Sequence, residues 1–178
     1  MKIVRDKVLF LSFFILLVTA CSKQDREVMI ANEIKAIDNY AENQKSSAVD
    51  VVVNAGATRI VKREGTGNGA VSGDSLYIKY GGYTFNNGPS SLFDTNLDSL
   101  SSKLGIEILE RGFDLGKCKL AEGQLIKGLE LGLTGVKEGE YCYVVFPSNL
   151  GFGKSGTGIV PKMTPLIYEV WVTKIKKQ

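Results

Sequence analysis

The chain has 178 residues, of which 44% are apolar and 23% are charged, a composition that supports one compact domain and a short targeting segment. Its first 20 residues hold three basic and one acidic residue, so the formal net charge of +3 falls to +1 beyond them, which is no footprint for nucleic acid. The sequence contains no histidine, which excludes Ser-His-Asp and Cys-His catalysis and every histidine-ligated metal site.

Residues 1–20 have the pattern of an export signal. Basic residues at Lys2, Arg5 and Lys7 precede the apolar run 8–18, which is shorter than the roughly 20 residues of a membrane span. Cys21 follows, and residues 18–21 (Val-Thr-Ala-Cys) resemble the lipobox of bacterial lipoproteins. We therefore expect cleavage after residue 20 and lipidation of Cys21, which would anchor the protein to a bacterial cell membrane on the periplasmic side or at the cell surface. The alternative is an ordinary secretory signal that happens to contain a cysteine.

The segment 21–57 is predicted to be a lipidated tether followed by a helical extension. Residues 22–26 are polar, and from Arg26 to about Asn43 apolar residues recur at helical spacing, namely Ile30, Ile34, Ile37 and Ala41. Charged residues lie mostly on the other faces. The pattern indicates an amphipathic helix of about four turns.

The remainder, residues 58–178, reads as a single domain that is rich in strands. Strands are predicted at Ser75 to Tyr80, Tyr141 to Pro147 and Leu166 to Lys174, after shorter β-branched stretches at Val51 to Val53 and Thr58 to Lys62. Residues 83–118 read as irregular apart from a short edge segment at 92–94, and Ile126 to Leu133 reads as a short helix closed by Gly135. The fold class is α+β around an antiparallel sheet.

Several stretches, taken together, resemble the FKBP family of peptidyl-prolyl cis-trans isomerases. Their order, spacing and residue types agree from about Thr58 to the C-terminus. They are Gly73–Gly82, Leu92–Asp94, Leu125–Gly132, Lys137–Glu140, Phe146–Gly153, and Ile159–Pro161 leading into Leu166–Val170. The resemblance implies a half-wrapped antiparallel sheet of about five strands around a short α-helix, with the ligand site between helix and sheet.

The same resemblance implies the site residues. Those expected to act in catalysis are Tyr80, Phe93, Asp94, Ile126, Phe152 and Tyr168. Those expected to bind substrate are Leu125, Leu129, Ile159 and Val160. The resemblance also implies that Asp94 accepts a hydrogen bond from the Tyr80 hydroxyl and interacts with the twisting carbonyl; the alternative is an ordinary loop-capping aspartate.

Such a site needs no nucleophile, because the barrier to isomerisation of an Xaa-Pro bond comes from amide resonance. In the twisted transition state the carbonyl loses dipolar character, so a dry, apolar site favours that state over the hydrated planar amide. We therefore expect proline-containing extracytoplasmic proteins or peptides as clients, without cofactor or metal. Oligomeric state, client identity and macrolide binding remain open.

The sequence departs from the family pattern at several positions. Aligned without a gap, the usual aromatic pair before the helix reads Gly116 and Cys118, although a short insertion would bring Phe113 there instead. Leu129 occupies the floor position that is usually tryptophan, and Phe152 replaces a tyrosine whose hydroxyl usually bonds the ligand. Both keep the site apolar, so reduced or altered isomerase activity is expected. The alternative function is a non-catalytic peptide-binding or chaperone-like lipoprotein module, and a third is a surface lipoprotein that assembles with partners.

The strand pattern predicts an apolar outer face on the sheet. Alternation leaves these residues facing outward: Tyr77, Tyr141, Tyr143, Val145, Ile167, Glu169 and Trp171. Such a face is too apolar to be left in water. We expect the helix of residues 26–43 to cover it, a partner protein being the alternative. Cys118 and Cys142 are predicted to be buried free thiols, since the family's strand order would separate them.

Overall fold

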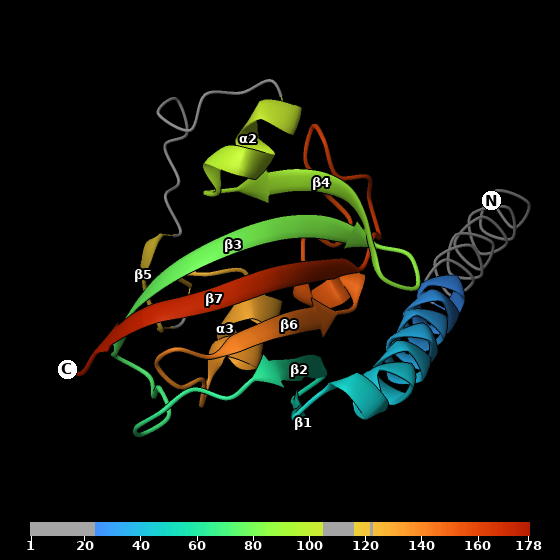
Figure 1. Cartoon of the computed structure of the whole chain (residues 1–178). Coiled ribbons are helices and arrows are strands. Elements are labelled where there is room, and N and C mark those ends of the chain that lie inside the picture. Colours follow the sequence, from blue (N-terminus) through green and yellow to red (C-terminus); the bar gives the residue numbers. More distant parts are fainter. Residues whose placement is uncertain (1–23, 105–115, 122) are drawn as a thin grey trace, which may run out of the picture. The chain divides into compact units, whose positions relative to one another are not determined.

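The computed structural model describes residues 24–104, 116–121 and 123–178. Within these residues, seven strands form one antiparallel sheet in the order β1-β2-β6-β7-β3-β4, with β5 also paired to β3 (Figure 1). The strands are β1 (Asp50–Asn54), β2 (Ala57–Arg63), β3 (Ser75–Phe85), β4 (Pro89–Thr95), β5 (Lys117–Lys119), β6 (Tyr141–Phe146) and β7 (Leu166–Lys176). The α+β class is confirmed. The sheet exceeds the expected five strands because β1 forms a hairpin with β2 and the short β5 adds to β3.

Helical segments are fewer and shorter. They are the N-terminal helix (residues 24–44), α2 (Asp98–Leu104), α3 (Lys127–Leu133) and the 3-10 turns η1 (Lys45–Ser47) and η3 (Ser148–Leu150). The predicted N-terminal helix and the predicted helix at 126–133 are both confirmed to within two residues of their ends. The signal peptide and Cys21 lie outside the described residues. No helix among the residues described is both long and apolar enough to cross a membrane.

The prediction of an irregular region from residue 83 to 118 is wrong over much of its length. β3 continues to Phe85, and β4 returns along it after the three-residue connection 86–88, in which Asn87 and Gly88 have positive φ. Gly81 and Gly82 weaken the strand signal in the sequence. In the structure they make room for rings, because a Cβ on Gly82 would lie 2.9 Å from Tyr168.

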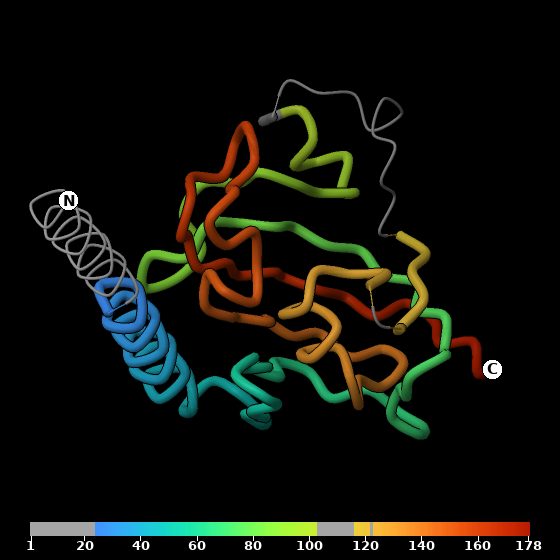
Figure 2. Tube along the Cα trace, turned by 180° about the vertical axis from the view of Figure 1, so that it is seen from behind, coloured from blue at the N-terminus to red at the C-terminus, as the bar shows by residue number. Residues whose placement is uncertain are grey.

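The main core lies between α3 and the inner face of the sheet (Figure 2). α3 lies close to the sheet because its two glycines face β6: a Cβ on Gly128 would lie 2.1 Å from the Phe146 ring, and one on Gly132 would lie 2.2 Å from Val144. Leu129 and Leu133 of α3 are buried in this core. The alternation predicted for β7 is confirmed, since Leu166, Tyr168 and Val170 all belong to it.

A second core lies on the outer face, where residues 33–44 of the N-terminal helix pack within the compact unit Glu33–Gln178. Ile37 and Ala41 of the helix are buried with Ile60, Phe85, Val145 and Ile167 of the sheet, and the Tyr40 ring meets Phe85 edge-on at 5.4 Å. The prediction that the helix covers the outer face is confirmed for this part of the face. It is wrong for Ile34, which remains 41% exposed because the contact stripe runs through Tyr40 instead.

The two described cysteines are buried and neither forms a disulfide, as predicted. Cys118 lies on β5 and Cys142 on β6, with β3 and β7 between them. Burial, together with the neighbouring Glu140 carboxylate, raises the pKa of the Cys142 thiol well above its ordinary value of 9.0. The thiol is therefore protonated and poorly reactive at neutral pH.

Candidate functional site

The candidate site is built around a hydrogen bond between two neighbouring strands. The Tyr80 hydroxyl on β3 donates to Asp94 Oδ2 on β4 at 3.0 Å. The backbone of Tyr80 is held by residues at the C-terminal end of β4. Its carbonyl accepts a hydrogen bond from the Thr95 hydroxyl at 2.6 Å, and its N–H donates to the Asn96 side chain at 2.8 Å. Tyr80 is 1% exposed and Asp94 is partly buried, so the pair has little room to move. The predicted interaction between Tyr80 and Asp94 is confirmed.

Aromatic rings surround this hydrogen bond. The Tyr168 ring lies 6.2 Å from that of Tyr80 and meets Phe93 edge-on at 5.7 Å, and Phe93 meets Phe152 edge-on at 6.0 Å. Behind them, Phe146 stacks on Tyr168 at 6.0 Å. These separations are typical of mutually stabilising aromatic contacts. The rings come from β3, β4, β6, β7 and the turn after η3, so the tertiary fold alone brings them together.

The start of α3 contributes the aliphatic part of the site. Ile126 precedes the helix with an extended backbone, and it packs partly exposed against the main core. Leu125 is buried beside it, and Leu129 is 1% exposed below. Because leucine replaces the tryptophan expected at this position, the floor presents less aromatic surface but stays apolar.

The segment after β6 carries Phe152 and the last two predicted site residues. Val160 is buried in the main core, whereas Ile159 is 60% exposed. Backbone hydrogen bonds from Thr157 N–H to Val160 O at 2.8 Å and from Met163 N–H to Gly153 O at 2.8 Å close the loop. Ile159 therefore stands at the outer edge of the segment, exposed to solvent.

The electrostatics of the site favour neutral groups beside a single carboxylate. Burial, and then the nearby Asp94 and Tyr80, raise the pKa of the Tyr168 hydroxyl well above its usual value of 10.0. Tyr168 is therefore an uncharged hydroxyl at neutral pH. Among the described residues, no group of three or more acidic or cysteine side chains is arranged to hold a metal ion.

Three contributing residues were not predicted as parts of the site. Gly82 admits the Tyr168 and Phe93 rings, because its Cβ would lie 2.9 Å and 3.2 Å from them. Phe146 supports Tyr168 from below. Glu33 on the N-terminal helix binds Ser148 at the start of the turn that carries Phe152. The two adjacent glycines in a strand are a sequence signal that could have identified Gly82. No sequence signal identifies Glu33, because 115 residues separate it from Ser148.

A family model described as FKBP-type peptidyl-prolyl cis-trans isomerase matches residues 67–173, more than half of the chain. The chain belongs to this family. All ten residues expected to act in catalysis or to bind substrate fall within the matched range. The family membership and the Tyr80–Asp94 geometry therefore rest on the same part of the chain.

Two relatives differ in the share of their own length that matches this chain. An "FK506-binding protein" of Neisseria meningitidis serogroup B is 32% identical over 117 residues, which are 64% of this chain and 90% of that protein. "FK506-binding protein 5" of Dictyostelium discoideum is 37% identical over 108 residues, 60% of this chain but only 6% of the relative. This FKBP thus spans nearly all of the short relative and a small part of the long one.

A solved structure supports the fold. The peptidyl-prolyl cis-trans isomerase of Pseudomonas syringae pv. tomato aligns with a TM-score of 0.58 at 18% identity, covering 85% of this chain and 96% of that one. At this identity the likeness concerns the arrangement of helices and strands.

Proposed function

We propose that this FKBP is a peptidyl-prolyl cis-trans isomerase that acts on Xaa-Pro bonds of extracytoplasmic proteins and assists their folding. The observation that carries the proposal is the Tyr80–Asp94 hydrogen bond of 3.0 Å, set among the rings of Phe93, Phe152 and Tyr168. An apolar site with one oriented carboxylate is suited to stabilising a twisted amide.

The chemistry follows from the amide bond. Resonance opposes rotation with a barrier of about 18–20 kcal/mol, so uncatalysed isomerisation takes tens of seconds or longer. Twisting the bond removes the dipolar character of the carbonyl. An apolar surrounding disfavours the planar dipolar amide more than the twisted one, and this difference lowers the barrier.

Each part of the site has a role in this proposal. The rings and the side chains of Ile126 and Leu129 surround the proline and exclude water. Tyr80 fixes the orientation of Asp94, and Asp94 interacts with the carbonyl carbon as its double-bond character to nitrogen is lost. Ile159, at the exposed edge, contacts the residues that flank the proline.

A non-catalytic peptide-binding module is the second candidate function. Two residues favour it: Leu129 gives a smaller floor than tryptophan, and Phe152 has no hydroxyl to bond a peptide. Neither change disturbs the Tyr80–Asp94 pair, which is why isomerisation is the leading proposal.

A protease-coupled assay on an Xaa-Pro peptide separates the two functions. We expect the wild type to accelerate isomerisation, and Tyr80→Phe and Asp94→Asn to lower kcat/KM by about 3- to 30-fold, the range that corresponds to one hydrogen bond or one lost charge. Asp38→Asn, on the exposed side of the N-terminal helix, is the matched control and leaves the rate unchanged. Measurable peptide binding without any acceleration by the wild type would establish the binding module instead.

The proposed location rests on residues 1–21. We propose that the chain is exported and attached by lipid at Cys21 to a bacterial membrane, facing the periplasm or the cell exterior. Metabolic labelling with a radioactive fatty acid tests this proposal. Label should enter the wild-type chain and be lost in Cys21→Ser, whereas label that persists in Cys21→Ser would refute the attachment site.

A further inference from the structure

The outer face of the sheet carries five lysines at the end away from the second core. In the register of β5, β3 and β7, Tyr77 lies between Lys117 and Lys174, and Ser75 lies between Lys119 and Lys176. One row further along, Lys79 is paired with Trp171. Residues that are paired across antiparallel strands point to the same face. These five residues form what we call the lysine face: Lys79, Lys117, Lys119, Lys174 and Lys176.

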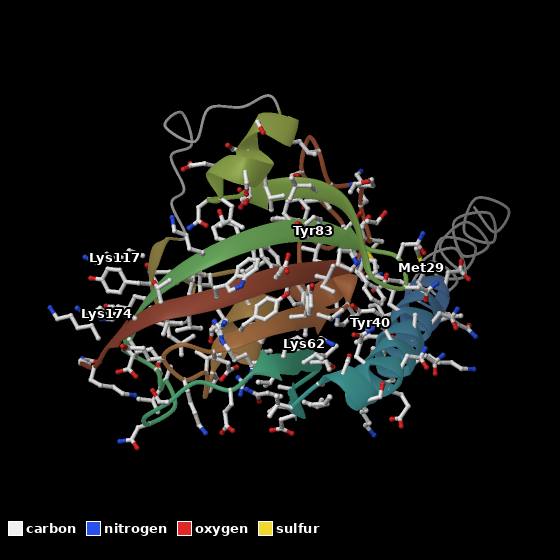
Figure 3. The ribbon with its side chains drawn as sticks, viewed as in Figure 1. Met29, Tyr40, Lys62, Tyr83, Lys117 and Lys174 are labelled. Atoms are coloured by element: carbon white, nitrogen blue, oxygen red, sulfur yellow. The ribbon has the colours of Figure 1, made fainter. Side chains whose placement is uncertain are left out.

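The direction of the lysine face is fixed by the residues between the lysines. Leu76, Ile78 and Cys118 are buried in the main core, and Ile175 packs against it. The alternating residues of β3, β5 and β7 must therefore point outward. All five lysines are exposed, and Figure 3 shows Lys117 and Lys174 projecting from the same end of the sheet.

The lysine face carries an excess of positive charge. Across the described part of the chain, none of its five lysines takes part in an ion pair, and the printed lysine pairs involve Lys45, Lys127, Lys137 and Lys177 instead. Two carboxylates border the face. Glu169 accepts hydrogen bonds from the hydroxyls of Tyr141 and Tyr143 at 2.6 and 3.1 Å, and Glu138 accepts one from the backbone N–H of Ile175 at 2.9 Å. They offset only part of the charge of the five lysines. Lysines two strands apart stand about 10 Å from each other, so their fields add over the face.

Aromatic side chains complete the surface. Tyr77 lies among the lysines, with the Lys117 ammonium 5.8 Å from its ring centre. Trp171 is paired with Lys79 across β3 and β7, and its ring stacks on that of Tyr141 at 5.0 Å. Tyr77, Tyr141 and Trp171 are all partly exposed and lie outside the cluster that the N-terminal helix covers. Tyrosine and tryptophan beside lysine are typical of protein surfaces that enter the headgroup region of a bilayer.

We propose that the lysine face binds the surface of an anionic phospholipid bilayer. Each lysine close to such a surface strengthens binding by about fivefold, and Tyr77 and Trp171 add contact with the headgroup region. All five cations are lysines. Arginine, whose planar fork binds phosphate through two hydrogen bonds, is the usual choice where individual phosphates of a nucleic acid or phosphopeptide are recognised. A flat array of mobile point charges fits a fluid layer of headgroups instead.

This binding mode has a consequence for the candidate site. Tyr80 and Tyr77 belong to the same strand, but Tyr80 points to the inner face and Tyr77 to the outer face. A domain bound through its lysine face would therefore present the inner face, and the site, away from the membrane. The proposal does not depend on isomerase activity or on the attachment of lipid at Cys21.

The sole tryptophan of the chain, Trp171, reports on the lysine face directly. The full chain is mixed with vesicles of phosphatidylcholine alone or with phosphatidylglycerol added, both carrying bromine-labelled acyl chains that quench tryptophan at short range. The basic residues Lys2, Arg5 and Lys7 also attract the chain to anionic vesicles, so the contribution of the lysine face is isolated by the variants below, which change that face alone. We expect quenching with phosphatidylglycerol vesicles, little with phosphatidylcholine, and its loss in about 1 M salt, where charges are screened beyond about 3 Å.

The variant Lys117→Gln/Lys174→Gln should weaken this quenching by about 25-fold in lipid concentration, since two lysines are lost. The matched control Lys45→Gln/Lys127→Gln removes two lysines elsewhere and should leave it unchanged. Circular dichroism verifies that both variants are folded. Equal quenching by both vesicles, or quenching unchanged in Lys117→Gln/Lys174→Gln, would overturn the proposal. A Trp171 response to poly-glutamate or to duplex DNA but not to vesicles would also overturn it, in favour of a soluble polyanion.

Discussion

The Glu33 carboxylate accepts two hydrogen bonds from Ser148, one from its backbone N–H at 2.8 Å and one from its hydroxyl at 3.0 Å. Ser148 is 0% exposed, and its carbonyl in turn accepts the N–H groups of Gly151 and Gly153, at 3.0 and 2.9 Å. Phe152 lies between these two glycines. The N-terminal helix therefore fixes the turn that presents an aromatic ring to the candidate site.

Replacing Glu33 tests this connection. Glu33→Ala leaves a buried N–H without its acceptor, which costs about 1–3 kcal/mol, and it frees the turn that holds Phe152. We expect a lower urea midpoint and slower isomerisation, the latter measured far below the unfolding transition. Glu33→Gln keeps one acceptor oxygen and should have the smaller effect. Glu42→Ala on the same helix, whose partner Lys45 is exposed, is the control. A midpoint for Glu33→Ala equal to that of the control would contradict the connection.

The close contact between α3 and β6 predicts a sharp response to one added methyl group. In Gly128→Ala the new Cβ would lie 2.1 Å from Cγ of Phe146, whose ring stacks on Tyr168. Alanine favours a helix over glycine by about 1 kcal/mol, but overpacking of this kind costs about 1–3 kcal/mol and displaces the ring. We expect a net loss of stability in urea unfolding together with a lower isomerisation rate.

The control for Gly128→Ala is Gly158→Ala, because a Cβ at Gly158 meets nothing within 4 Å and its φ is not positive. Its urea midpoint should equal or exceed that of the wild type. Equal stability of the two alanine variants would contradict a close contact between α3 and β6.

How much was predictable from the sequence depends on the range of the signal. Tyr80 and Asp94 lie 14 residues apart in motifs typical of the family, and their hydrogen bond was predicted. The alternation of β7 was also predictable, because successive side chains of a strand point to opposite faces of the sheet. The contact stripe of the N-terminal helix was only half predicted. More than one apolar stripe fits the same helix, and only the tertiary partner, Phe85, selects the one through Tyr40.

Contacts between distant segments and clusters of charge were beyond sequence reasoning. Nothing near Glu33 or Ser148 marks them as partners. The lysine face was hidden for a related reason. Its members come from three strands between residues 79 and 176, so the low net charge of the chain concealed them until the register of β5, β3 and β7 aligned them.

The buried acidic hydroxyl and thiol groups predict loss of stability at alkaline pH. The pKa of Tyr168 and that of Cys142 are raised, chiefly by burial, above their ordinary values of 10.0 and 9.0. In the unfolded chain both groups lose their protons at those ordinary values, while in the folded protein they remain protonated. Their stabilising contribution is therefore complete below about pH 9 and declines as the pH rises further.

Urea midpoints measured from about pH 8 to about pH 11 check this dependence. We expect a steady fall above about pH 9 that is shallower in Cys142→Ala, compared with its own midpoint at the lower end of the range. Ultraviolet absorbance follows the ionisation of the tyrosines, and we expect it to show that Tyr168 stays protonated until the protein unfolds. A midpoint that stays constant over the whole range would contradict the assignment.

Arg59 connects the sheet to the end of α3 and carries the last prediction. Its Nε lies 3.1 Å from Glu140 Oε1 in an almost fully buried ion pair, and its Nη1 donates to the carbonyls of Gly132 and Thr134, at 2.9 and 2.7 Å. These carbonyls are the ones that a helix leaves unpaired at its C-terminus. Arg59 thereby caps α3, the helix to which Leu129 belongs.

Removing the guanidinium alone leaves the Glu140 carboxylate buried without a countercharge. We expect Arg59→Met to lose about 3–5 kcal/mol of unfolding free energy, and Arg59→Met/Glu140→Gln to recover part of it because no charge is then left unpaired. Arg59→Lys restores the charge but does not reproduce the planar donor set, so it should fall between Arg59→Met and the wild type. If Arg59→Met and the double variant unfold at the same urea concentration, the capping of α3 rather than the ion pair accounts for the role of Arg59.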